Sequence, residues 1–208
     1  MTANNLRASL VGRAFRLEWS TIGWMLIEFG VALYAGIMAH SLALIAFSLD
    51  SLIEIGHAGL LIWRLNTELR LGADFPEAIE RRASRIGAWI LAGLALYIAI
   101  GALWEFWHHQ SAEFSTLGLG VTLVAIPLMY FLSRVKYGLA DRLGSRALRG
   151  DAAESASCLY LSITIVIALI AQSFLGFWWI DAAASLIIAF FVAREAREGF
   201  EDEECGGD

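Results

Sequence analysis

Six long apolar stretches dominate the sequence and limit what it can fold into. Short polar segments separate them, and they lie at residues 20–38, 41–63, 86–106, 116–133, 150–174 and 178–196. A helix needs about 20 apolar residues to cross a bilayer, and each stretch is close to that length. Hydrophobic residues make up 58% of the chain and charged residues 17%, against roughly 45–50% and about 25% in soluble domains. The sequence therefore predicts an all-α membrane protein, a bundle of six transmembrane helices in a lipid bilayer. It excludes a soluble, disordered or nucleic-acid-binding chain.

The basic residues are confined to alternate connections of this predicted bundle. All 15 Lys and Arg residues lie before the first span, around the polar stretches 67–85 and 133–149, or at the end of the sixth span. Loops rich in Lys and Arg stay in the cytoplasm, so we expect both termini there. The predicted organisation is a cytoplasmic N-terminal segment at 1–16, a six-helix transmembrane domain at 17–197 and a short acidic cytoplasmic tail at 198–208.

Ionisable side chains inside the predicted spans are the second informative feature. Such a group near the bilayer centre costs about 2.5–3.5 kcal/mol, so several are kept only where they pair with something or bind something. The spans contain, away from their ends, Glu28, Asp50, Glu54, His57, Glu154 and the thiol Cys158. With 133–149 assigned to a loop, no Lys or Arg lies deep in any span. The carboxylates are therefore expected to lack a counter-ion within the protein.

Two pairs of these residues repeat the same spacing. Asp50 and Glu54 are four positions apart on the second predicted helix, and Glu154 and Cys158 are four positions apart on the fifth. Residues at this spacing share one helix face, so two facing helices would present four ligands to one ion. Three carboxylates and a thiolate suit a divalent cation in tetrahedral geometry. The alternative is that each acid is protonated and hydrogen-bonded to a neighbouring helix.

Four further residues have more than one interpretation. His57 follows Glu54 by three positions and is either a ligand near the cytoplasmic side, a proton acceptor or a structural residue. Glu28 is an accessory partner of the site, a proton site or a structural residue. Asp181 is expected to stabilise the start of its own helix. Cys205 belongs to the acidic tail, and its role is open.

The two motifs resemble those of the cation diffusion facilitators. Residues 41–54, SLALIAFSLDSLIE, are similar to the family's second helix, where an acid or histidine is followed four positions later by an acid. Residues 145–158, SRALRGDAAESASC, are similar to its fifth helix, which usually carries His-x-x-x-Asp with an Asp three positions earlier, here Asp151. Six helices with both termini inside also match, and the resemblance covers about residues 17–196.

This resemblance implies a homodimer that exports zinc, manganese, iron, cobalt or cadmium in exchange for protons. Carried over by position, the transport ligands are Asp50, Glu54, Glu154 and Cys158. The second pair is Glu-x-x-x-Cys instead of the usual His-x-x-x-Asp, which bears on metal preference. No counterpart of the family's usual cytoplasmic domain follows the sixth helix, so the resemblance points to a short form.

We therefore expect a secondary transporter that exports a divalent transition metal, with zinc as the first choice, by proton antiport. The metal ion is its transported substrate, and we expect neither a prosthetic group nor an enzymatic activity, nor a nucleic-acid partner. The expected location is a bacterial inner membrane. The alternative is a membrane metal sensor or regulatory subunit that uses the same pocket without transport.

Overall fold

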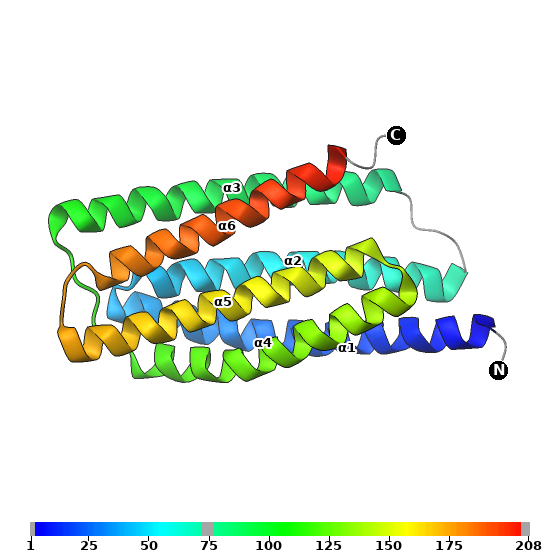
Figure 1. Ribbon diagram of the computed structural model, residues 1–208, viewed down its shortest axis with the longest axis horizontal. Helices are drawn as coiled ribbons and strands as arrows, with labels where there is room; N and C mark the ends of the chain where they lie inside the picture. Colours follow the sequence, from blue (N-terminus) through cyan, green and yellow to red (C-terminus); the bar gives the residue numbers. More distant parts are fainter. Residues whose placement is uncertain (1–2, 72–76, 205–208) are drawn as a thin grey trace.

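The chain folds into six helices, as predicted from the apolar stretches. A computed structural model describes residues 3–71 and 77–204. The helices are α1 (Ala3–Ala39), α2 (Leu42–Leu71), α3 (Glu77–His108), α4 (Thr116–Leu143), α5 (Arg146–Leu175) and α6 (Ile180–Glu204). The start of α1 and the end of α6 lie at the same end of the bundle (Figure 1), which fits termini on one side of a membrane.

The helix ends follow local capping chemistry. Ser115 and Ser145 cap α4 and α5, and their side chains accept hydrogen bonds from the backbone of Gly118 and Leu148. A side-chain oxygen at this position satisfies a backbone donor that the first turn leaves free. Gly144 ends α4 in the left-handed region, with φ 62°, a conformation that glycine adopts without strain.

Two helices pair along one flank of the bundle, and four form the other part. α3 packs against α6, while α1 contacts α2 and α4, and α4 contacts α5 (Figure 1). α2 and α5 connect the two parts, because α2 contacts α3 and α6, α5 contacts α6, and the two helices contact each other. The polar residues of the second and fifth predicted spans therefore lie on neighbouring helices at the centre of the molecule.

The outside of the bundle is apolar. Large side chains such as Trp89, Leu96 and Phe190 are more than half exposed, which suits a surface that faces lipid. Five helical segments are long and apolar enough to cross a membrane within the described residues: Ser9–Ala39, Leu42–Thr67, Arg85–His108, Thr116–Leu143 and Ala147–Leu175. The sixth predicted span also forms a helix, α6, but charged residues at 181 and 194 leave it a shorter uncharged stretch. The protein is thus an all-helical, multi-pass membrane bundle.

The polar stretches between the spans are more helical than predicted. Residues 133–149 were expected to form a loop, but α4 continues to Leu143 and α5 begins at Arg146. The chain therefore turns only at Gly144 and Ser145. Similarly, the expected boundary at residue 17 lies inside α1, and Val11 and Ala14 pack there in an apolar cluster with residues of α2, α4 and α5. Helical polar ends extend the bundle on the side of the termini.

Asp181 lies at the start of its own helix, as expected, and also binds the start of α2. It is the acidic residue in the first turn of α6, and its carboxylate accepts hydrogen bonds from the start of α2. Ser41 Oγ donates to Oδ1 over 2.5 Å, and the backbone N–H of Ala43 donates to Oδ2 over 3.3 Å. Asp181 thus joins the start of α6 to the tight turn between α1 and α2, where His40 has φ 51°.

Candidate functional site

Asp50 and Glu54 lie one turn apart on α2 and are almost completely buried. Their exposed fractions are 1% and 4%. None of their four carboxylate oxygens has a hydrogen-bond partner among the described residues. Burying a polar group without a hydrogen-bond partner costs free energy, so buried polar groups are normally hydrogen-bonded to one another. Two adjacent carboxylates with no protein partner are therefore a place where a cation would be stabilised.

Glu154, the third predicted ligand, contacts His57. The Nδ1 atom of His57 on α2 lies 2.5 Å from Oε1 of Glu154 on α5. Both side chains are partly exposed, at 23% and 22%. His57 therefore bridges to a predicted ligand, and the contact brings the two motif-bearing helices together. Asp50 lies within electrostatic reach of both residues.

Cys158, the fourth predicted ligand, contacts Glu28. Its Sγ lies 3.5 Å from Glu28 Oε1. Ser51 Oγ donates to the same oxygen over 2.8 Å, and Trp24 Nε1 donates to Glu28 Oε2 over 2.7 Å. Glu28 is thus a hydrogen-bond acceptor shared by α1, α2 and α5, next to the thiol and adjacent to the Asp50–Glu54 pair. These contacts place Glu28 beside the predicted ligands, and its role as accessory partner, proton site or structural residue stays a prediction.

The predicted ligands lie around the contact between α2 and α5, but in this structure they are not arranged to bind a single ion. Asp50 interacts electrostatically with Glu154 and Glu28, and Glu54 interacts with Asp50 and Glu154. Over the described ranges, no three His, Cys, Asp or Glu side chains are close enough to hold one ion. The structure therefore brings the four residues into one buried acidic region, and their joint coordination of an ion stays a prediction.

Glu195 on α6 belongs to the same acidic region and was missed in the sequence. It interacts electrostatically with Asp50 and Glu154, is hydrogen-bonded to Ser157, and contributes to the field at Glu54. Its Oε1 atom is buried without a hydrogen-bond partner within the described part of the chain. A signal was available, because Glu195 lies inside the sixth predicted span at 178–196, where an ionisable side chain is costly.

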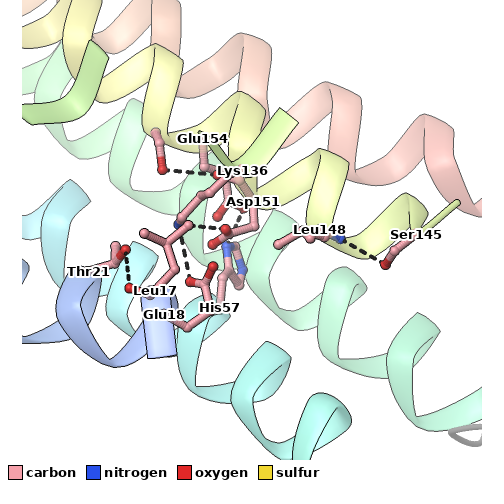
Figure 2. Close-up of polar contacts among 10 residues, drawn as sticks. Leu17, Glu18, Thr21, His57, Lys136, Ser145, Leu148, Asp151 and Glu154 are labelled. Carbon is pink, nitrogen blue, oxygen red and sulfur yellow. Dashed lines mark hydrogen bonds and ion pairs between the residues drawn. The ribbon is translucent and has the colours of Figure 1, made fainter. Parts of the chain in front are cut away.

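A buried Lys corrects the expectation that no basic side chain lies among the helices. Lys136 has an exposed fraction of 0%, and its Nζ lies 2.5 Å from Asp151 Oδ2 and 3.1 Å from Glu18 Oε2 (Figure 2). The assignment of 133–149 to a loop concealed it. Lys136 pairs with Glu18 and Asp151, and with none of the four predicted ligands. Asp50 and Glu54 take part in no ion pair found among residues 3–71 and 77–204.

Cys205, the remaining cysteine, lies outside the described residues. The acidic tail can therefore be placed only as far as its first residues, where Glu198 Oε1 accepts a hydrogen bond from Arg194 over 2.8 Å at the surface of α6.

Comparison with known proteins identifies the domain. The model of the cation efflux transmembrane domain matches residues 21–202. The chain is 26% identical over 184 residues to the cation-efflux pump FieF of Pectobacterium carotovorum, covering 85% of this chain and 60% of that protein. It is 29% identical over 89 residues to FieF of Shewanella oneidensis, covering 43% of this chain and 30% of that protein.

A third relative is an uncharacterized transporter of Synechocystis, with 24% identity over 179 residues, covering 83% of this chain and 57% of the relative. The chain thus matches at most 60% of the length of these relatives. The family match covers most of the chain, including both motif-bearing helices. The chain belongs to the cation efflux family, and residues 21–202 are its transmembrane domain.

Proposed function

We propose that this protein exports a divalent transition-metal cation from the cytosol, with zinc as the first candidate, in exchange for protons. The proposal rests mainly on the burial of Asp50 and Glu54. Their exposed fractions are 1% and 4%, and their carboxylate oxygens have no hydrogen-bond partner among the described residues. Two carboxylates in an apolar surrounding attract a divalent cation strongly. They are also groups to which protons bind in competition with that cation.

The neighbours of the pair support a transition metal over a calcium-type ion. Glu154 and Cys158 extend from the adjacent helix α5, and His57 contacts Glu154. Thiol and imidazole donors favour zinc, cadmium and other transition metals, while all-oxygen sites favour calcium and magnesium. The ion would move from this region by alternating access around a site within the membrane. Two of the named relatives are bacterial cation-efflux pumps, in line with a bacterial plasma membrane. The homodimer that the family resemblance implies is part of this proposal.

The test is cation flux in proteoliposomes. The wild-type protein and the Asp50→Asn variant are reconstituted with a metal-sensitive dye inside, and zinc, manganese, iron, cobalt and cadmium are offered in turn under a pH gradient. Asp141→Asn is the matched control, because Asp141 is an exposed acid at the end of α4 that pairs with Arg149 over 2.8 Å. We expect flux in the wild type and the control and none in Asp50→Asn.

Two results would contradict the proposal. Full flux in Asp50→Asn would remove Asp50 from the transport site. Saturable zinc binding by the wild type without flux of any metal would favour the alternative of a sensor or regulatory subunit.

The thiol gives a test of the substrate class. Cys158→Ser replaces a soft sulfur ligand with a smaller, harder oxygen, so the affinity for cadmium and zinc should fall more than that for manganese. We expect a relative change of roughly tenfold, about 1.4 kcal/mol, measured by isothermal titration calorimetry. Equal losses for all three metals would show that Cys158 does not contact the ion.

A further inference from the structure

Three buried charged side chains form a cluster apart from the predicted cation ligands. Glu18 on α1, Lys136 on α4 and Asp151 on α5 have side-chain exposures of 0%, 0% and 8%. The ammonium group lies between the two carboxyl groups, 3.1 Å from Glu18 and 2.5 Å from Asp151 (Figure 2). The cluster therefore joins three helices, and Asp151 is its least buried member.

The charges of this cluster do not balance when all three groups are ionised. Two carboxylates and one ammonium leave one negative charge, and an uncompensated buried charge costs several kcal/mol. Asp151 also interacts electrostatically with His57 from α2 and Glu154 from α5. These two are in contact with each other over 2.5 Å, so a positive charge on His57 is matched by Glu154. Among the ion pairs found in residues 3–71 and 77–204, Lys136 is the only basic partner of Glu18 and Asp151, so one negative charge of the cluster remains.

One proton removes this excess. The carboxyl groups of Glu18 and Asp151 both contact the Lys136 ammonium group, so they lie close together and interact electrostatically. Two carboxylates held side by side do not both ionise readily, because each raises the electrostatic cost of charging the other. A proton held between them turns this repulsion into a hydrogen bond, and with Lys136 it makes the cluster neutral.

A metal ion does not fit this position. The Lys136 ammonium lies within ion-pair distance of both carboxyl groups, and it would repel a divalent cation bound to the same oxygens. The cluster thus differs in its chemistry from the Asp50–Glu54 pair, which forms no ion pair with any described residue. A proton is the cation that the cluster can accept.

We propose that Glu18 and Asp151 share one exchangeable proton, held beside Lys136, and that this is a proton-binding site separate from the cation site between α2 and α5. On release, the proton leaves from Asp151, the least buried member of the cluster, and one negative charge stays behind. On uptake, the cluster becomes neutral again. Its part in cation exchange rests on the proposed function, whereas the binding of the proton rests on the cluster itself.

The test is infrared spectroscopy of the full chain in lipid, free of metal. Protonated carboxyl groups have a carbonyl-stretching band that ionised carboxylates lack. The wild-type spectrum should contain a component of this band that is absent from Glu18→Gln, shifts in heavy water and shrinks as the pH is raised. In Glu18→Gln, Asp151 and Lys136 form a neutral pair without a proton, so the variant keeps the balance of charge that folding requires.

Asp151→Asn provides a second variant, since Glu18 and Lys136 then form the neutral pair and the same component should disappear. Glu113→Gln is the control and should retain the component, because Glu113 is an exposed acid in the connection between α3 and α4. Identical wild-type and Glu18→Gln spectra would overturn the proposal. So would a component that responds neither to pH nor to heavy water, because it would belong to a fixed structural proton.

Transport then separates this proposal from the proposed function. If the protein exchanges cations for protons, Glu18→Gln should move one proton fewer per cation than the wild type, and an unchanged ratio would remove the cluster from the exchange. If the wild type moves no cation, the proposed function fails, while the infrared result still decides whether the cluster binds an exchangeable proton.

Discussion

The imidazole of His57 lies 2.5 Å from the Glu154 carboxylate through Nδ1, while the other edge of its ring faces Gly87 on α3. One side chain of α2 therefore contacts both α5 and α3. A methyl group at position 87 would overlap the His57 ring at Nε2, so only glycine leaves room for this arrangement. The contact connects the acidic region to the flank formed by α3 and α6.

Gly87→Ala should weaken cation binding by displacing His57 from Glu154. Alanine stabilises an isolated helix by about 1 kcal/mol relative to glycine, so any loss reflects the overlap and not the helix. Gly93→Ala on the same helix is the matched control, because an added methyl group there meets nothing within 4 Å. We expect a several-fold lower zinc affinity in Gly87→Ala only, measured by calorimetry. Equal affinities in the two variants would show that the position of His57 is unimportant for binding.

Glu195→Gln should also lower the cation affinity. The substitution removes one negative charge that acts on Asp50, Glu54 and Glu154 while keeping the size of the side chain. Charge interactions of this kind, partly screened, amount to about 1–2 kcal/mol, so we expect a several-fold loss. Glu198→Gln changes the charge of the same helix at an exposed position paired with Arg194 and should have no effect. Equal zinc affinities in wild type and Glu195→Gln would separate α6 from the site.

Asp181→Ala should destabilise the protein without changing cation binding. The carboxylate accepts hydrogen bonds from Ser41 and the Ala43 backbone at the start of α2, and the loss of a buried charged acceptor costs about 1–3 kcal/mol. Glu113→Ala removes an exposed acid from the same end of the bundle and should have little effect. Denaturant unfolding in detergent micelles measures the difference. A stability equal to that of Glu113→Ala would contradict the assigned role.

Lys136→Met should be the most destabilising single change, because it leaves Glu18 and Asp151 buried together without a counter-charge. Breaking a buried ion pair in this way typically costs about 3–5 kcal/mol. Arg149→Met breaks the exposed pair with Asp141 and should cost at most about 1 kcal/mol. Adding Glu18→Gln and Asp151→Asn to Lys136→Met should restore much of the stability. If the triple variant is no more stable than Lys136→Met, the loss arises from packing and not from charge.

The apolar stretches predicted the six helices and the tight turns at His40 and between Leu175 and Ile180, because the length of a spanning helix is set by the bilayer. The same reasoning misplaced the ends. Polar residues at 133–143 were assigned to a loop, yet a helix continues beyond the apolar stretch wherever neighbouring helices cover it. Hydropathy does not predict which polar segments pack against neighbouring helices.

The site shows a similar division. The four-residue spacing predicted Asp50, Glu54, Glu154 and Cys158 as candidate ligands, since spacing fixes which side chains share a helix face. The partners of these residues come from other helices, and a single sequence contains no information on those contacts. The pairing of Lys136 with Glu18 and the approach of Glu195 depend on how α1, α4 and α6 pack, so they emerged only with the structure.

The absence of Asp50 and Glu54 from the ion pairs of the described residues has an electrical consequence. Two carboxylates carry two negative charges, and a divalent ion held by both would make the loaded pair neutral. Moving a charge through the membrane potential requires about 2.3 kcal/mol per 100 mV, but a neutral group moves with no electrical work. Voltage would then act on the step in which the emptied pair returns, and two protons taken up by the same carboxylates would make that step neutral as well.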